Sequence, residues 1–387
     1  MIIPIKTDCR HFRADRPCTP HKQTGVTCPE CPTYDPVGTR LLIVKLAADG
    51  DVLRTTSLLP SLRRRFPGAH LTWLTESSAE PLLRHHPLID RIWASPERCL
   101  PQLLAQDFDL VINPDCDAKS CALAALAKGK DRKGFLAGPA GEPMPLNEAA
   151  AQWHQMGLWD PLKRANRRTY QEIMQAIAEL DGPIEPPQLV LTSQEIEDTR
   201  RHLRSAGWSQ DRSRPVVGFN LGAGSRWPQK ALPLPTIERV IEAVLAGTPA
   251  AEMWLLGGPD ERERNAWLVQ RFGPRVLDTG VDNTKRHFAA LVGHVDVLVS
   301  ADTLAMHIGI ALGKHVIAHF GPTSPWEIDL FGRGEKIFPD TPHLACYCNG
   351  CRQTPHCNEL ITPDEVVGAI RRGLQARNGD YKFALRG

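Results

Sequence analysis

The sequence predicts an α/β protein built from two doubly wound parallel sheets. Short runs of continuous apolar residues, typical of strands buried on both faces, alternate with stretches that have a helical period. This alternation occurs in the first half of the chain and restarts in the second half. A length of 387 residues suits two domains of ordinary size. We therefore expect two similar halves with a cleft between them.

The first half begins after a polar extension, residues 1–38, that is rich in Cys, His and Pro. The first apolar run is followed by an amphipathic helical pattern that ends at Pro67-Gly68. Strands are expected at residues 41–44, 70–74 and 110–112, and a further helix at 118–127. Parallel strands joined through helices form right-handed crossovers, so these segments predict one sheet.

The second half repeats this pattern and adds two glycine-rich turns. The stretch 220–225 follows its first strand, and Gly257-Gly258 follows the next strand. Strands are expected at 216–219, 253–256, 295–299 and 315–319, and helices at 236–245, 262–272, 305–312 and 362–375. The last helix opens with a capping box, Thr362 to Glu365, that has proline at its first helical position.

Composition excludes several classes of protein. Lys and Arg number 46 and Asp and Glu 44, a net charge of +2, which argues against a nucleic-acid binder that depends on bulk charge. No apolar run approaches the roughly 18 residues that cross a bilayer. The first residues lack the apolar core of a signal peptide, so we expect a cytoplasmic protein with at most peripheral contact to the inner face of a membrane.

Polar residues follow several of the predicted strands, where ligands bind in open α/β sheets. Asp51 is either a carboxylate that stabilises a helix start or a general base. Asp302 and Thr303 begin a helix one turn before His307, which suits either an N-cap or a diphosphate site. Glu261 either binds a ribose or stabilises its own helix. The residues taken singly leave these alternatives open.

Five motifs in order resemble glycosyltransferase family 9, the heptosyltransferase family, which has the GT-B fold. The resemblance covers residues 40–375, nearly everything beyond the extension. The motifs are Gly50-Asp51-Val52, Gly222-Ala223-Gly224 with Trp227 and Lys230, Gly257-Gly258-Pro259, Asp302-Thr303 with His307, and Phe320-Gly321-Pro322-Thr323. Two positions depart from the family pattern, because Leu304 replaces a usual glycine and Arg54 a frequent histidine.

The resemblance implies an inverting transferase that moves a sugar from a nucleotide-diphosphate donor, often ADP-heptose, to an acceptor hydroxyl. Asp51 would be the base, Lys230 would contact the donor phosphates and Glu261, or Glu263 after a register shift, would hold the ribose. The donor-binding residues implied in this way are Asn220, Gly222, Ala223, Ser225, Lys230, Gly258, Glu261, Asp302, Thr303 and His307. No catalytic metal is expected, since Lys230 and a helix N-terminus would neutralise the diphosphate.

The resemblance also implies a domain division. The expected parts are the extension at 1–38, an N-terminal Rossmann-like acceptor-side domain at 39–195, a C-terminal Rossmann-like donor domain at 196–361, and 362–387, a tail whose helix crosses back to the first domain. We place a linker near 185–212. The acceptor would be a glycan such as lipopolysaccharide core, a glycolipid or a protein, and an oligomer is compatible with the sequence.

Eleven cysteines include two clusters outside the family pattern. One cluster consists of Cys9, Cys18, Cys28 and Cys31, and the other of Cys346, Cys348, Cys351 and Cys357 within the segment 346–357. Four thiolates suit a structural zinc ion, with His11 or His21 as substitute ligands in the first cluster. Some protein-modifying members of the resembled family carry iron, so iron or an iron–sulfur cluster is the alternative, as is one site shared by both clusters.

Two other functions stay open at this point. An epimerase-like enzyme of the same fold would need a second acid or base near the donor sugar, for which the sequence offers no clear candidate. A non-catalytic scaffold that binds sugar nucleotides would use the cysteine clusters for assembly.

Overall fold

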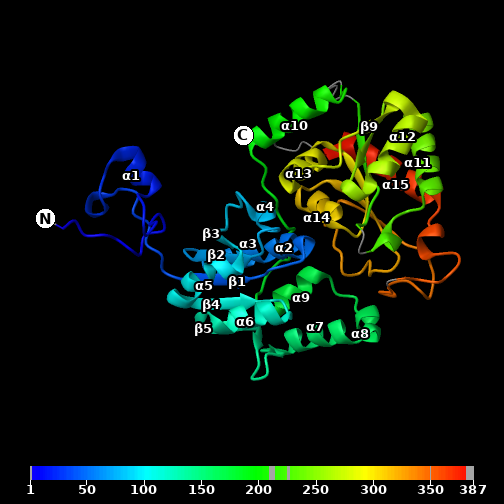
Figure 1. Ribbon diagram of the computed structural model, residues 1–387. Coiled ribbons are helices and arrows are strands. Elements are labelled where there is room, and N and C mark those ends of the chain that lie inside the picture. Colours follow the sequence, from blue (N-terminus) through cyan, green and yellow to red (C-terminus); the bar gives the residue numbers. More distant parts are fainter. Residues whose placement is uncertain (1, 209–213, 225–226, 349, 381–387) are drawn as a thin grey trace.

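Two six-stranded sheets, each with helices on both faces, form the body of the protein (Figure 1). The computed structural model describes residues 2–208, 214–224, 227–348 and 350–380. Each sheet separates two clusters of buried apolar side chains, one on each face. The predicted fold class, two Rossmann-like halves, is confirmed.

The first sheet has the order β3-β2-β1-β4-β5-β6. Its strands are β1 (Arg40–Val44), β2 (His70–Thr75), β3 (Arg91–Ala94), β4 (Asp107–Asn113), β5 (Lys128–Ala137) and β6 (Pro143–Pro145). All neighbours are parallel except β5 and β6, which are antiparallel. The carboxyl ends of β1 and β4 therefore meet at one edge of the sheet.

The second sheet has the order β12-β11-β10-β7-β8-β9 and is wholly parallel. Its strands are β7 (Val216–Asn220), β8 (Glu252–Leu256), β9 (Val276–Asp278), β10 (Val297–Ala301), β11 (His315–His319) and β12 (Gly334–Ile337). The predicted strand at 295–299 thus begins two residues later than expected.

Helices connect these strands. In the first half they are α2 (Asp49–Thr55), α3 (Leu59–Arg65), α4 (Glu80–Leu83), α5 (Pro96–Ala105), α6 (Ala118–Leu126), α7 (Glu148–Leu158), α8 (Asp160–Ala165) and α9 (Tyr170–Ile177). In the second half they are α10 (Ser193–Ser205), α11 (Leu234–Gly247), α12 (Arg262–Phe272), α13 (Lys285–His294), α14 (Leu304–Ala311) and α15 (Pro363–Asp380). A short turn, residues 56–58, divides the first amphipathic pattern into α2 and α3.

The strands that sequence patterns missed lie mostly at sheet edges. β3 and β6 end the first sheet, and β9 and β12 end the second. An edge strand is short and partly solvated, so it lacks the continuous apolar run of a central strand. β5 was missed because its first residues are mostly charged and partly exposed.

The linker expected near 185–212 is a helix over much of its length, which corrects that prediction. Thr192 and Glu195 form the capping box that starts α10. The helix packs against α13, where the rings of His202 and His287 lie 4.7 Å apart. The predicted domain boundary at 195/196 therefore falls inside an element that packs with the second half.

The last helix, which we expected to cross to the first domain, packs on the second half over the residues that the structure describes. α15 packs against α11 and against β10, β11 and β12 of the second sheet. Its apolar face includes Val366, Ile370 and Leu374, which join the buried cluster around Val297 and Ile317. Burying that face on its own sheet removes the driving force for an excursion to the other half.

Arg10 of the extension contacts the first half. A short helix, α1 (Thr19–Thr24), lies within the extension. Arg10 donates to the carbonyl oxygens of Gly68 (2.8 Å) and Ala69 (3.1 Å) and forms ion pairs with Asp35 and Asp90. Within the described ranges, no helix is long and apolar enough to cross a membrane.

Candidate functional site

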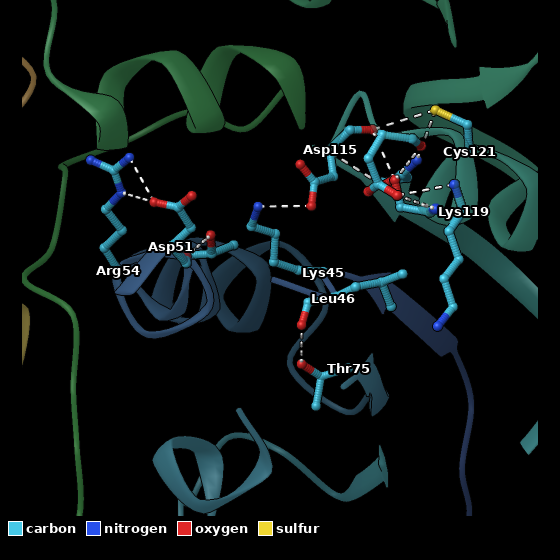
Figure 2. A network of polar contacts seen from close by, with 12 residues as sticks. Lys45, Leu46, Asp51, Arg54, Thr75, Asp115, Lys119 and Cys121 are labelled. Atoms are coloured by element: carbon cyan, nitrogen blue, oxygen red, sulfur yellow. Dashed lines mark hydrogen bonds and ion pairs between the residues drawn. The ribbon is translucent and has the colours of Figure 1, made fainter. Parts of the chain in front are cut away.

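Asp51 lies in the first turn of α2, just beyond the carboxyl end of β1. Its side chain is 35% exposed, so a ligand can reach the carboxylate. Arg54, one turn later, contacts Oδ1 of Asp51 through Nε at 2.9 Å and Nη2 at 2.8 Å (Figure 2). Burial alone would raise the pKa of Asp51, but the charges of Arg54 and Lys45 hold it below its usual value. Asp51 is therefore ionised at neutral pH, as a general base must be.

Arg54 is itself held in place by an aromatic ring. Its guanidinium carbon lies 3.6 Å from the ring centroid of Tyr170, the first residue of α9. The Tyr170 hydroxyl and the Thr55 hydroxyl lie 2.7 Å apart. Stacking and ion pairing together fix the orientation of the group that faces Asp51.

A buried ion pair lies behind Asp51 that sequence reasoning did not identify. Lys45 follows β1 directly, and its Nζ lies 2.8 Å from Oδ2 of Asp115, which follows β4 (Figure 2). Lys45 is only 4% exposed. Burial alone would lower its pKa, but Tyr170, Asp115 and Asp51 raise it above the ordinary value, so the ammonium stays charged. The position of a charged residue one or two places after each of two adjacent strands was the available signal.

The second half contributes a compact set of charged residues at the start of α14. Nζ of Lys230 lies 3.0 Å from Oδ2 of Asp302 and 2.8 Å from its carbonyl oxygen. Nε2 of His307 lies 3.7 Å from the other carboxylate oxygen. Burial alone would raise the pKa of Asp302, but Lys230, His307 and Arg54 lower it to about 2. Burial and the charge of Arg54 lower the pKa of His307 to about 4, so this imidazole is neutral at pH 7.

Helix α14 of the second half lies against α2 of the first half (Figure 1). A Cβ placed on Gly50 would lie 2.6 Å from Cδ2 of His307, so only glycine permits this approach. The contact brings Asp51 close enough to His307 for each charge to affect the pKa of the other. Residues about 250 positions apart in the sequence therefore form one site.

The two glycine-rich turns converge on Glu261, which is 8% exposed. Its Oε2 accepts a hydrogen bond of 2.7 Å from the backbone N–H of Gly258. A Cβ on Gly222 would lie 1.7 Å from Oε1, so the turn after β7 requires glycine there. The carboxylate thus lies at the carboxyl ends of β7 and β8, where a ribose would bind in an open sheet. Glu263, the alternative, lies in the first turn of α12.

The remaining predicted donor-binding residues belong to the first glycine-rich turn, and the structure describes only some of them. The Asn220 amide donates to the carbonyl of Gly222 at 3.0 Å, and lies 3.4 Å from both the Ser300 and Thr303 hydroxyls. Ala223 is partly exposed in the first glycine-rich turn. Ser225 lies outside the described residues. Asn220 and Thr303 therefore brace the turn, and the structure draws Lys230, Asp302 and His307 into one group.

The predicted metal ligands are not drawn together into a site. Among residues 2–208, 214–224, 227–348 and 350–380, no group of three or more Cys, His, Asp or Glu side chains could hold a metal ion. In the first cluster, Cys28 and Cys31 flank a single turn, while His21 Nδ1 lies 3.1 Å from the carbonyl oxygen of Val26. In the second, burial and then Cys346 and Cys351 raise the pKa of the Cys357 thiol to about 11.

Comparisons with known proteins agree with the fold. The model of glycosyltransferase family 9 (heptosyltransferase) matches residues 98–356. The lipopolysaccharide heptosyltransferase 1 of Pseudomonas aeruginosa is 25% identical over 385 residues, covering 87% of this chain and 98% of its own length.

Two solved structures share the fold. A family 9 glycosyltransferase of Veillonella parvula superposes with a TM-score of 0.71 at 17% identity, over 88% of this chain and 98% of that one. The second is the iron-containing dodecameric heptosyltransferase TibC of enterotoxigenic Escherichia coli, in complex with ADP-D-beta-D-heptose. It superposes with a TM-score of 0.54 at 13% identity, over 89% of this chain and 79% of that one.

Proposed function

The chain belongs to glycosyltransferase family 9, and from this premise we propose that it transfers a heptose-like sugar from an ADP-sugar donor to a hydroxyl of a cell-envelope glycan or of a protein. The chain is a glycosyltransferase. The donor is proposed because TibC is described in complex with ADP-D-beta-D-heptose. The glycan acceptor is proposed because the Pseudomonas relative is a lipopolysaccharide heptosyltransferase. For the same reason we propose that the enzyme acts at the inner face of a membrane.

One observation carries this proposal: α2, which holds Asp51, packs against α14 of the second half so closely that Gly50 lies against His307 of the Lys230–Asp302–His307 group. An ionised, accessible carboxylate at this junction would remove the proton from the acceptor hydroxyl as its oxygen attacks the anomeric carbon. The bond from that carbon to the diphosphate then breaks, and attack from the opposite face inverts the configuration.

Charge on the departing diphosphate would be neutralised from the second half. Lys230 supplies a cation, and the N-terminus of α14 supplies backbone N–H groups aimed the same way. Glu261, at the ends of β7 and β8, would accept hydrogen bonds from the ribose hydroxyls. Residues of this chain thus supply the base, the positive charge and the ribose contact that the proposed transfer needs.

Replacing the proposed base distinguishes a transferase from an epimerase-like enzyme and from a non-catalytic scaffold. We expect Asp51→Asn to lower kcat by about 10²- to 10⁴-fold, because general-base assistance contributes about that much, while ADP still binds. Transfer is measured with ADP-heptose and a heptose-deficient lipopolysaccharide acceptor, and ADP binding by calorimetry. The matched control is Asp198→Asn, an exposed aspartate on α10.

Unchanged transfer in Asp51→Asn would refute the base assignment. Release of a free altered sugar without acceptor would indicate the epimerase-like reaction. Binding of ADP with no turnover of any donor would indicate a scaffold.

The C-terminal cysteines are proposed separately as ligands of a structural iron or zinc ion. The support is the close spacing of Cys346, Cys348, Cys351 and Cys357 in the sequence, together with the description of TibC as iron-containing. The side chains fit such an ion only if it draws them closer than they now lie. No step of the proposed transfer passes through it.

A further inference from the structure

A pocket of about 520 Å³ lies between the extension and the first sheet, at the edge opposite Asp51. One wall consists of extension residues, including Arg10 and Cys9. The other wall consists of the residues that begin the strands, among them Arg40 of β1, His70 of β2 and Arg91 of β3. Asp51 follows the other end of β1, so this pocket is separate from the site described above. Its volume is that of a small-molecule site.

The extension forms this wall through specific contacts. The backbone N–H of Arg10 donates to the carbonyl of Asp35 at 2.7 Å, and that of Val37 to the carbonyl of Asp8 at 2.8 Å. The Arg10 side chain is neutralised by Asp35 and Asp90 while it holds the loop at Gly68. The wall is therefore fixed by backbone hydrogen bonds and by the partly exposed side chain of Arg10.

Positive charge at the pocket exceeds what its carboxylates neutralise. Lys130 and Asp109 form an ion pair of 2.7 Å. Among the described residues, the guanidinium groups of Arg40 and Arg91, and of Arg13 beside them, form no ion pair. Burial first, and then the charges of Arg13 and Arg40, lower the pKa of Arg91. The charge of Asp90 opposes this shift, but no carboxylate among the described residues pairs directly with Arg40 or Arg91, so both guanidinium groups can bind an anion.

A buried imidazole and one carboxylate complete the lining. His70 is 4% exposed, and its Nδ1 is buried without a hydrogen-bond partner. Burial lowers its pKa to about 4, so the ring is neutral and can offer one N–H group. Asp107 lines the pocket without an ion pair among the residues that the structure describes. Its carboxylate can accept hydrogen bonds from hydroxyl groups.

We propose that this pocket binds a small phosphorylated polyol, with Arg40, Arg91 and His70 on the phosphate and Asp107 on the hydroxyls. Two guanidinium groups match the fork geometry of phosphate oxygens. A phosphate would also give Nδ1 of His70 its missing partner, which removes the cost of an unsatisfied buried polar atom.

The test is calorimetric titration of the full chain with three probes: inorganic phosphate, ribose 5-phosphate and ribose. We expect ribose 5-phosphate to bind most tightly and ribose not to bind. In Arg40→Gln/Arg91→Gln we expect affinity at least about tenfold lower, since charge-assisted hydrogen bonds to phosphate are lost. Arg64→Gln/Arg98→Gln removes the same charge from exposed positions and should bind like wild type.

Phosphate could also bind near Lys230, so Lys230→Gln is titrated in parallel. Retained binding in this variant supports the second pocket. Binding that disappears in Lys230→Gln, or that is unchanged in Arg40→Gln/Arg91→Gln, overturns the proposal. If the double variant fails to fold, Arg40→Gln alone decides, because that side chain makes no hydrogen bond among the described residues.

Discussion

At the scale of single residues, Arg54 stands out because its guanidinium group contacts the proposed base directly. It pairs with Asp51 within one helix turn and stacks on Tyr170 from α9. We therefore regard it as a positioning residue that keeps Asp51 ionised. Its own pKa is raised by Asp51 despite the opposing effect of burial, so the two charges are mutually stabilised.

Replacing Arg54 should move the pH profile rather than abolish transfer. In Arg54→Gln, loss of the nearest positive charge raises the pKa of Asp51, so the acid limb of kcat/KM shifts to higher pH. At neutral pH we expect a loss smaller than the roughly 10²-fold or more of Asp51→Asn. Arg54→Lys should keep the limb near its wild-type position. An unshifted limb in Arg54→Gln would refute this role.

At the scale of elements, local pattern predicted where helices and strands begin but not where each packs. α15 starts at the predicted capping box, yet its apolar face is buried on the second sheet. The glycine-rich turns were recognised from their spacing, whereas the requirement for Gly222 comes from Glu261, 39 residues later. Contacts of this kind depend on which faces meet.

The segment 346–357 is the element whose order should depend on a metal. It reaches the first half through Arg164, which donates to the carbonyl of Cys346 at 3.0 Å. We expect about one iron or zinc ion per chain by elemental analysis, and loss of that ion in Cys348→Ser/Cys351→Ser. If the variant without the ion loses about 2 kcal/mol of unfolding free energy, its Tm should fall by roughly 4–8 °C. Cys99→Ser serves as the control, and unchanged metal content in the double variant would contradict the assignment.

At the scale of the whole molecule, α13 fastens the two halves together. Arg286 donates to the carbonyl of Pro81 in the first half at 3.1 Å and to that of Val190 at 2.7 Å. It also pairs with Glu195 of α10. The neighbouring Lys285 pairs with Asp49 of α2. These contacts hold α2, and with it Asp51, against the second half.

The Glu195–Arg286 pair should make stability depend on acid pH. Hydrogen bonding to Arg286 lowers the pKa of Glu195 to about 2, from 4.5. A depressed carboxyl pKa stabilises the fold above pH 4.5, and this contribution is lost as pH falls from 4.5 towards 2. Glu195→Gln should therefore cost about 1–3 kcal/mol at pH 7 and almost nothing at pH 2.

Urea unfolding at pH 7 and at pH 2–3 measures this difference. Glu197→Gln, on the same helix but exposed, is the matched control and should cost under about 1 kcal/mol. Equal losses in both variants at pH 7 would show that the Glu195–Arg286 pair does not stabilise the fold.

The sequence by itself determined the two α/β halves, the central strands and the residues that follow them, including Asp51, Lys230, Asp302 and His307. Apolar runs, caps and glycine turns depend on local backbone geometry, so they can be recognised along the chain. Only the tertiary structure decided that α2 packs against α14 at His307, that Lys45 pairs with Asp115, where α15 packs and that a pocket lies between the extension and the first sheet. Each joins segments far apart in sequence, and such contacts depend on complementary shape and charge between packed surfaces.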